Sequence, residues 1–175
     1  MGCNAIQLAV AAGYDVVTTC SPRNFEYVKS LGAKWVFDYS SETTVEEIVE
    51  LLKGRSFVGA LAIGAVTSVG NGTAAAEACL EIVRRSEGRK FVAMVMMYRG
   101  EVPEGVQTKF ILGLDIKDNE LGAIIFEKFL PKALENGSFV FAPKPLVVGK
   151  GLDKIQEAFD VLQKGVSAQK VVVSL

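Results

Sequence analysis

The sequence predicts an α/β fold built on a doubly wound parallel sheet. Short apolar runs rich in β-branched residues alternate with segments of helical periodicity, which is typical of βαβ units. Half of the 175 residues are hydrophobic, so the chain can form one domain with a real core, with or without an appendage. The formal net charge is −1 and no basic stripe is present, so we expect no nucleic-acid partner.

The first predicted element is a helix from Gly2 to about Ala12, ended by Gly13. Its opening residues, GCNAIQLA from Gly2, are typical of a glycine-rich nucleotide-binding turn entering its helix. A buried strand and most of the glycine-rich loop normally precede this point, so we expect both to be missing. In the usual strand order 3-2-1-4-5-6 the missing strand is central, and its two neighbours would face a gap.

The next elements alternate regularly. We predict a strand at 15–20, a helix at 23–31 ended by Gly32, and a strand at 34–39. Thr43 and Glu46 have the spacing of a capping box, which predicts a helix that ends at Gly54. A strand at 57–63, a helix at 73–85 and a strand at 91–97 follow. We interpret the methionines of the last strand as core packing, namely Met94, Met96 and Met97.

The alternation changes character near Asp118. A polar loop at 100–108 and a strand at 109–116 precede this point, so we predict a nucleotide-binding domain at 1–118 and a second unit at 119–175. In the second unit we expect a helix at 120–135 that is interrupted at Pro131. Extended stretches at 138–141 and 145–148, a helix at 152–164 and a strand at 170–173 complete it. The last helix has an apolar stripe of Ile155, Phe159 and Leu162.

Metal, disulfide and membrane features are not expected. The chain contains no histidine, and its three cysteines, Cys3, Cys20 and Cys79, lie far apart without CxxC spacing. No apolar run approaches the roughly 20 residues that span a bilayer, and no signal segment is visible. We therefore predict a cytoplasmic protein without a metal site.

Cofactor chemistry is predicted where the second sheet strand ends, because ligands of such sheets lie at the carboxyl ends of the strands. An NAD enzyme usually has an acidic residue here, whereas this chain reads Ser21-Pro22-Arg23-Asn24. Ser21 and Asn24 are neutral donors and Arg23 supplies positive charge, which favours NADP(H). The alternative is that Ser21 and Pro22 only begin a helix, as N-cap and first residue.

Two neighbouring strand ends extend this site. Tyr39 closes the next strand and is expected beside the adenosine ribose and its phosphate. Asp38 opposes this interpretation, because a carboxylate would repel that phosphate; strand alternation predicts that it points elsewhere. Gly64, after the strand at 57–63, would allow a backbone to approach the nicotinamide ribose.

These residues resemble the medium-chain dehydrogenase/reductase superfamily, which includes the alcohol-dehydrogenase-like enzymes, and in particular the fungal zinc-independent trans-enoyl reductases and related zinc-binding-dehydrogenase-like proteins. The resemblance rests on the opening GCNAIQLA, on SPRNF from Ser21 and LGA from Leu31, on Phe37-Asp38-Tyr39, and on KGVSAQK from Lys164. It implies a Rossmann-type sheet without its first strand, followed by the C-terminal remnant of a GroES-like catalytic domain. The implied NADPH contacts are residues 21–24, Tyr39, Met94, Val95, Val166 and Ser167, with Leu112, Gly113 and Leu114 on the substrate side.

The resemblance implies an NADPH-dependent oxidoreductase that transfers hydride to a C=C or C=O of a small substrate. The cofactor performs this chemistry and the protein supplies position, so no catalytic side chain is assigned. The alternative is a non-catalytic remnant that binds nucleotide weakly, or that self-associates through exposed sheet edges. A Rossmann-like methyltransferase is disfavoured, since the ribose-binding acid it needs is also missing.

Overall fold

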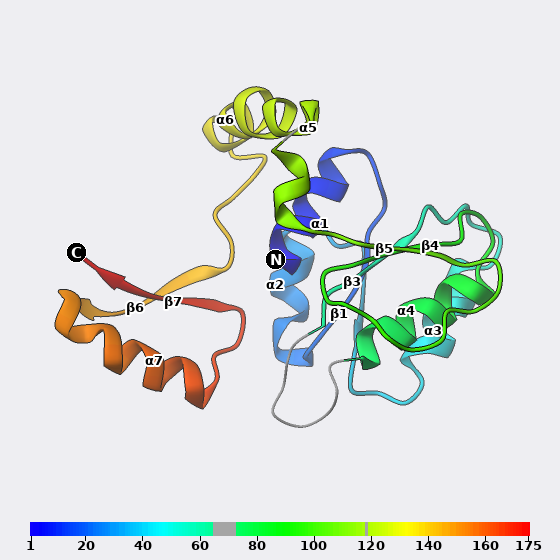
Figure 1. Ribbon diagram of the computed structural model, residues 1–175, viewed down its shortest axis with the longest axis horizontal. Coiled ribbons are helices and arrows are strands. Elements are labelled where there is room, and N and C mark those ends of the chain that lie inside the picture. The colour runs from blue at the N-terminus through cyan, green and yellow to red at the C-terminus, as the bar shows by residue number, and fades with distance from the viewer. Residues whose placement is uncertain (65–72, 118) are drawn as a thin grey trace.

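The computed structural model describes residues 1–64, 73–117 and 119–175, whose strands pair only in parallel (Figure 1). Three sheets result: β1 (Val17–Cys20) with β2 (Trp35–Asp38); β3 (Ala60–Ala62) with β4 (Phe91–Met94) and β5 (Gln107–Phe110); and β6 (Lys144–Lys150) with β7 (Gln169–Ser174). Parallel strands joined by helices confirm the α/β class.

The first two sheets are the two sides of one interrupted sheet. Their strand orders are β2-β1 and β3-β4-β5, and within the described residues β1 and β3 belong to separate sheets. This is the pairing that the order 3-2-1-4-5-6 gives to the strands on either side of its central strand. The inner edges of β1 and β3 therefore do not hydrogen-bond to each other.

Helices cover both faces of the β1–β2 pair. On one face, α1 (Gly2–Ala11) and α2 (Phe25–Ser30) form a core in which Ile6 contacts Val28 and Leu31. On the other face, α3 (Thr44–Leu52) and α4 (Ala74–Arg85) pack against Val17 and Phe37 of the strands. Alternate strand side chains thus enter different cores, which explains the doubly wound arrangement.

The largest core lies where α4 covers β3 and β4. Val83 and Val92 are completely buried there, and Met94 is 4% exposed. The prediction that all three methionines pack in the core is correct only for Met94. Because β4 ends at Met94, Met96 and Met97 lie beyond the strand and are 43% and 68% exposed.

The predicted capping box of α3 is wrong. Thr43 is the N-cap residue, but its hydroxyl donates to the Glu47 carboxylate at 2.5 Å instead of capping the backbone. Glu46 is engaged by α4, since the Arg85 guanidinium donates to both of its carboxylate oxygens at 2.6 and 2.5 Å. This ion pair lowers the pKa of Glu46 and joins α3 to α4.

Several predicted boundaries also shift. The helix predicted at 23–31 is divided into a 3₁₀ turn, η1 (Pro22–Asn24), and α2. The strand predicted at 57–63 is shorter and consists of β3 alone. Phe57 lies outside it and forms an isolated bridge to Gly88. The strand predicted at 109–116 is β5 followed by a second 3₁₀ turn, η2 (Gly113–Ile116).

The helix predicted at 120–135 is present without a break at Pro131, but its hydrogen-bonding pattern changes just before this residue. Short α5 (Glu120–Gly122) continues into a π-helical stretch, η3 (Ala123–Phe129), and then into α6 (Leu130–Glu135), with Pro131 in its first turn. The predicted boundary at Asp118 lies outside the described residues. The stretch at 138–141 forms no strand.

The C-terminal unit leaves apolar side chains in solvent. A 3₁₀ turn, η4 (Leu152–Lys154), leads into α7 (Ile155–Lys164), which packs on β7 at one side of the molecule (Figure 1). The predicted apolar stripe of Ile155, Phe159 and Leu162 is 43–60% exposed.

Gln7 joins α1 to the C-terminal half. Its side chain is buried, accepts from the Val140 N–H at 2.8 Å, and donates to the carbonyls of Val140 and Cys3 at 3.2 and 3.3 Å. We predict that Gln7→Leu lowers the free energy of unfolding by about 1–3 kcal/mol, because both Val140 groups lose their partner. Urea denaturation measures this, and Gln156→Leu on exposed α7 is the control, with an expected change below about 0.5 kcal/mol. Equal effects of the two changes would contradict the prediction.

The burial of Cys79 in α4 predicts that the free energy of unfolding depends on pH. Burial raises the pKa of this thiol to about 11, above the 9.0 of an unburied thiol. The unfolded chain therefore ionises first as pH rises, and the native state should lose about 1 kcal/mol between pH 8 and pH 10. The difference in unfolding free energy between wild type and Cys79→Ala isolates this loss from other titrations. A difference independent of pH would contradict it.

Candidate functional site

The carboxyl ends of β1 and β2 bring together the residues predicted to hold the cofactor phosphate. The parallel register places Cys20 opposite Asp38, so the next residues, Ser21 and Tyr39, also lie side by side. The Ser21 hydroxyl donates to the Tyr39 hydroxyl at 3.4 Å. Tyr39 is 65% exposed, and this hydroxyl pair therefore faces solvent at the end of the sheet.

The start of η1 supplies charge beside this pair. Ser21 has the position of an N-cap and Pro22 is the first residue of the turn, as the alternative interpretation expected. However, the Ser21 side chain makes no capping hydrogen bond, so its hydroxyl is not used by the helix start. Arg23 is exposed and forms no ion pair within the described part of the chain. The Ser21 hydroxyl and the Arg23 guanidinium can therefore bind a ligand.

Asp38 is held by its own turn. Its carboxylate accepts hydrogen bonds from the Ser40 N–H at 2.9 Å and the Ser40 hydroxyl at 2.7 Å. These bonds lower the pKa of Asp38, so the group is anionic at neutral pH. Its charge reaches the end of β1, where burial first and Asp38 second raise the pKa of the Cys20 thiol.

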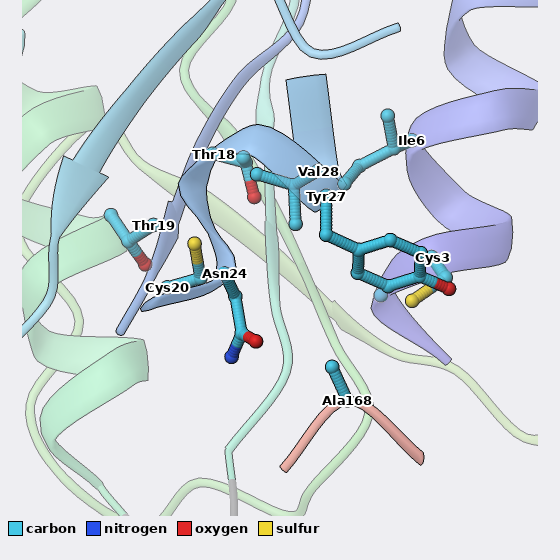
Figure 2. Close-up of a pocket in the computed structure, with 10 residues that line it drawn as sticks. Cys3, Ile6, Thr18, Thr19, Cys20, Asn24, Tyr27, Val28 and Ala168 are labelled. Carbon is cyan, nitrogen blue, oxygen red and sulfur yellow. The ribbon is translucent and has the colours of Figure 1, made fainter. Parts of the chain in front are cut away.

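The C-terminal half contributes to the same region through Ser167. The Asn24 amide donates to the Ser167 hydroxyl at 3.0 Å, across 143 residues of sequence. Figure 2 shows the Asn24 side chain directed at the segment that contains Ala168. Ala168 has a left-handed backbone (φ 49°), which is uncommon for a residue with a Cβ. Two residues predicted separately, Asn24 and Ser167, are therefore direct partners.

A cavity of about 220 Å³ lies between α1, β1 and this segment (Figure 2). Its lining includes Gly2 and Cys3 at the start of α1, and Thr18 and Thr19 of β1. A Cβ added to Gly2 would meet nothing within 4 Å, so the start of the helix is open to the cavity. An open helix N-terminus presents backbone N–H groups that suit an anion.

Tyr27 is a cavity residue that the sequence did not reveal. Its hydroxyl is buried without a nitrogen or oxygen partner in the described structure and lies beside the Cys3 thiol; burial raises the pKa of Tyr27. Figure 2 shows the ring between α2 and the first turn of α1. Tyr27 is three positions after Asn24, so both lie on one side of this helical segment. That spacing is the signal that could have identified it.

The remaining predicted residues, apart from Val166 and Ser167, belong to the other side of the sheet interruption. Met94 ends β4, and the Val95 N–H donates to the Ala62 carbonyl of β3 at 3.2 Å. Gly64 follows β3 at the margin of the described residues. The predicted substrate residues begin η2, and Leu112 and Leu114 are 48% and 69% exposed. Val166 and Ser167 precede β7. These groups are not brought into contact with Ser21 and Tyr39.

The described residues contain neither a metal-binding cluster nor a membrane-spanning helix. No three side chains among histidine, cysteine, aspartate and glutamate lie close enough together there to hold a metal ion. No helix in the same residues combines the length and apolar character that crossing a membrane requires.

Residues 1–112 match the family model described as zinc-binding dehydrogenase. The whole chain is 52% identical to dehydrogenase azaJ of Aspergillus niger and 37% identical to trans-enoyl reductase himH of Aspergillus japonicus, covering 50% and 49% of them. A mycobacterial protein solved with NADPH shares the fold, with a TM-score of 0.65 and 18% identity over 99% of this chain and 53% of that one. The chain thus spans about half the length of the curated relatives it matches.

The Asn24–Ser167 hydrogen bond predicts how firmly the segment before β7 is held. Ser167→Ala removes the acceptor, which should raise local opening about fivefold, since a hydrogen bond contributes about 1 kcal/mol. Trypsin cleavage after Lys164 under native conditions measures the opening. Ser174→Ala at the end of β7 is the control. Equal cleavage of wild type and Ser167→Ala would show that the bond does not hold the segment.

Proposed function

Because this chain belongs to the zinc-binding dehydrogenase family, within the medium-chain dehydrogenase/reductase superfamily, we propose that it binds NADP(H) for hydride transfer to a small substrate. The observation that supports this most strongly is the Ser21–Tyr39 hydroxyl pair, together with Arg23, which follows Ser21 by two residues and forms no ion pair within the described residues. Two hydroxyls and a guanidinium match the oxygen acceptors and negative charge of a 2′-phosphate. An NAD enzyme would have a carboxylate where Ser21 stands.

The described residues suit the cofactor along its length. Ser21, Arg23, Asn24 and Tyr39 would hold the adenosine phosphate. The open N-terminus of α1 at Gly2 would face the pyrophosphate, since an added Cβ there meets no atom. The residues assigned to the nicotinamide side are Gly64, Met94 and Val95, and Val166 and Ser167 are assigned as further cofactor contacts next to Asn24.

The bound cofactor supplies the hydride, and the chain orients it. We propose a polarised C=C or C=O as acceptor, with Leu112, Gly113 and Leu114 toward the substrate. The trans-enoyl reductase among the relatives supports a C=C acceptor. The exposed side chains of Leu112 and Leu114 are consistent with contact to an apolar substrate or to a further part of the protein.

A second candidate is nucleotide binding without turnover. The observation that favours it is the interruption between β1 and β3, which separates the phosphate-side residues from Met94 and Val95. Among the described residues, α3 and α4 share a core that joins the two halves. Self-association through the inner edges of β1 and β3 is the corresponding proposal for a partner.

The cofactor preference is tested by nicotinamide fluorescence. We predict that Arg23→Glu weakens NADPH binding by at least about tenfold and NADH binding by less than about threefold, because only NADPH presents the extra phosphate. Lys29→Glu is the matched control on α2, where Lys29 already pairs with Glu26. Equal losses for the two cofactors would contradict a phosphate contact of Arg23.

Turnover separates the two candidates. Micromolar binding of NADPH together with its oxidation by an enone would support the reductase. Binding without oxidation would support the binding-only alternative, and no binding of NADPH would contradict both.

A further inference from the structure

Asp38 occupies a position where its charge acts against the proposed phosphate site. It is adjacent to Tyr39 in sequence, and its cross-strand partner Cys20 is adjacent to Ser21. The carboxylate is anionic and its field reaches Cys20. A phosphate bound between Ser21 and Tyr39 would be repelled by a carboxylate free to turn toward it.

The main chain of Asp38 is fixed independently of its side chain. Its carbonyl accepts from the Ser41 N–H at 3.1 Å and from the hydroxyl of Thr44, a buried residue at the start of α3. Rotation of the side chain is therefore the movement that remains. Both hydrogen bonds to the carboxylate come from Ser40, which follows Tyr39 in the sequence.

We infer that Ser40 is a positioning residue for coenzyme choice, holding the Asp38 carboxylate in the turn and away from the Ser21–Tyr39 pair. This inference rests on the proposed function, because it concerns the same phosphate. The Ser40 hydroxyl provides the shorter of the two bonds, at 2.7 Å, and is the part that a substitution can remove. The Ser40 N–H alone then restrains the carboxylate, which spends more time facing the phosphate.

The test measures 2′,5′-ADP against 5′-AMP by calorimetry, since these two ligands differ only in the 2′-phosphate. Ser40→Ala is compared with Ser41→Ala, a matched control whose hydroxyl bonds to the Thr43 hydroxyl at 2.9 Å and leaves the Asp38 carboxylate untouched. The double variant Asp38→Asn with Ser40→Ala removes the charge as well as the hydroxyl. Thermal unfolding verifies that the variants fold.

We expect Ser40→Ala to reduce the preference for 2′,5′-ADP about three- to tenfold at low salt, and less at 0.5 M salt, where exposed charges are screened. Ser41→Ala and the double variant should retain the wild-type preference. A preference unchanged in Ser40→Ala, or a loss that the double variant retains, would overturn the inference while the proposed function stands. A wild-type chain that does not prefer 2′,5′-ADP would overturn the proposed function and the inference together.

Discussion

Four parallel residue pairs between β1 and β2, from Val17 opposite Trp35 to Cys20 opposite Asp38, determine where the polar groups of the site lie. The register places Ser21 beside Tyr39, and a slip of one residue would move each side chain to the other face. The register itself follows from packing. Val17 and Phe37 enter the core under α3 and α4, while Cys20 and Val36 enter the core under α1 and α2.

The two parts of the interrupted sheet are joined by helices. Ile82 of α4 lies in the same core as Ile48 and Val17, although α4 otherwise covers β3 and β4. The Arg85–Glu46 ion pair is partly exposed, so its contribution to stability is small compared with this shared core. The relative position of the phosphate-side and nicotinamide-side residues therefore depends mainly on apolar contacts of α4.

Much of the fold and the phosphate side of the site could be predicted from sequence, because strand ends of parallel sheets converge and Ser21 and Tyr39 end neighbouring strands. Competition between local partners was harder to foresee. Glu46 has the spacing of a capping box, but Arg85 of another helix binds it. The stripe on α7 showed that an apolar face exists without showing what covers it, and Phe159 is 60% exposed. Tyr27 was missed because its spacing from Asn24 is the sole signal in the sequence, and burial of its hydroxyl adds none.

The Asn24–Ser167 hydrogen bond sets an order in which the site is completed as the chain folds. Ser21 and Tyr39 are 18 residues apart, whereas Asn24 and Ser167 are 143 residues apart, which is three doublings of loop length. Closing the longer loop costs about 2 kcal/mol more chain entropy. The Ser21–Tyr39 contact can therefore form as soon as the first βαβ unit has folded. The Asn24–Ser167 contact can form only after the segment before the last strand has reached the site. Loss of the C-terminal strand would remove the second contact and leave the first in place.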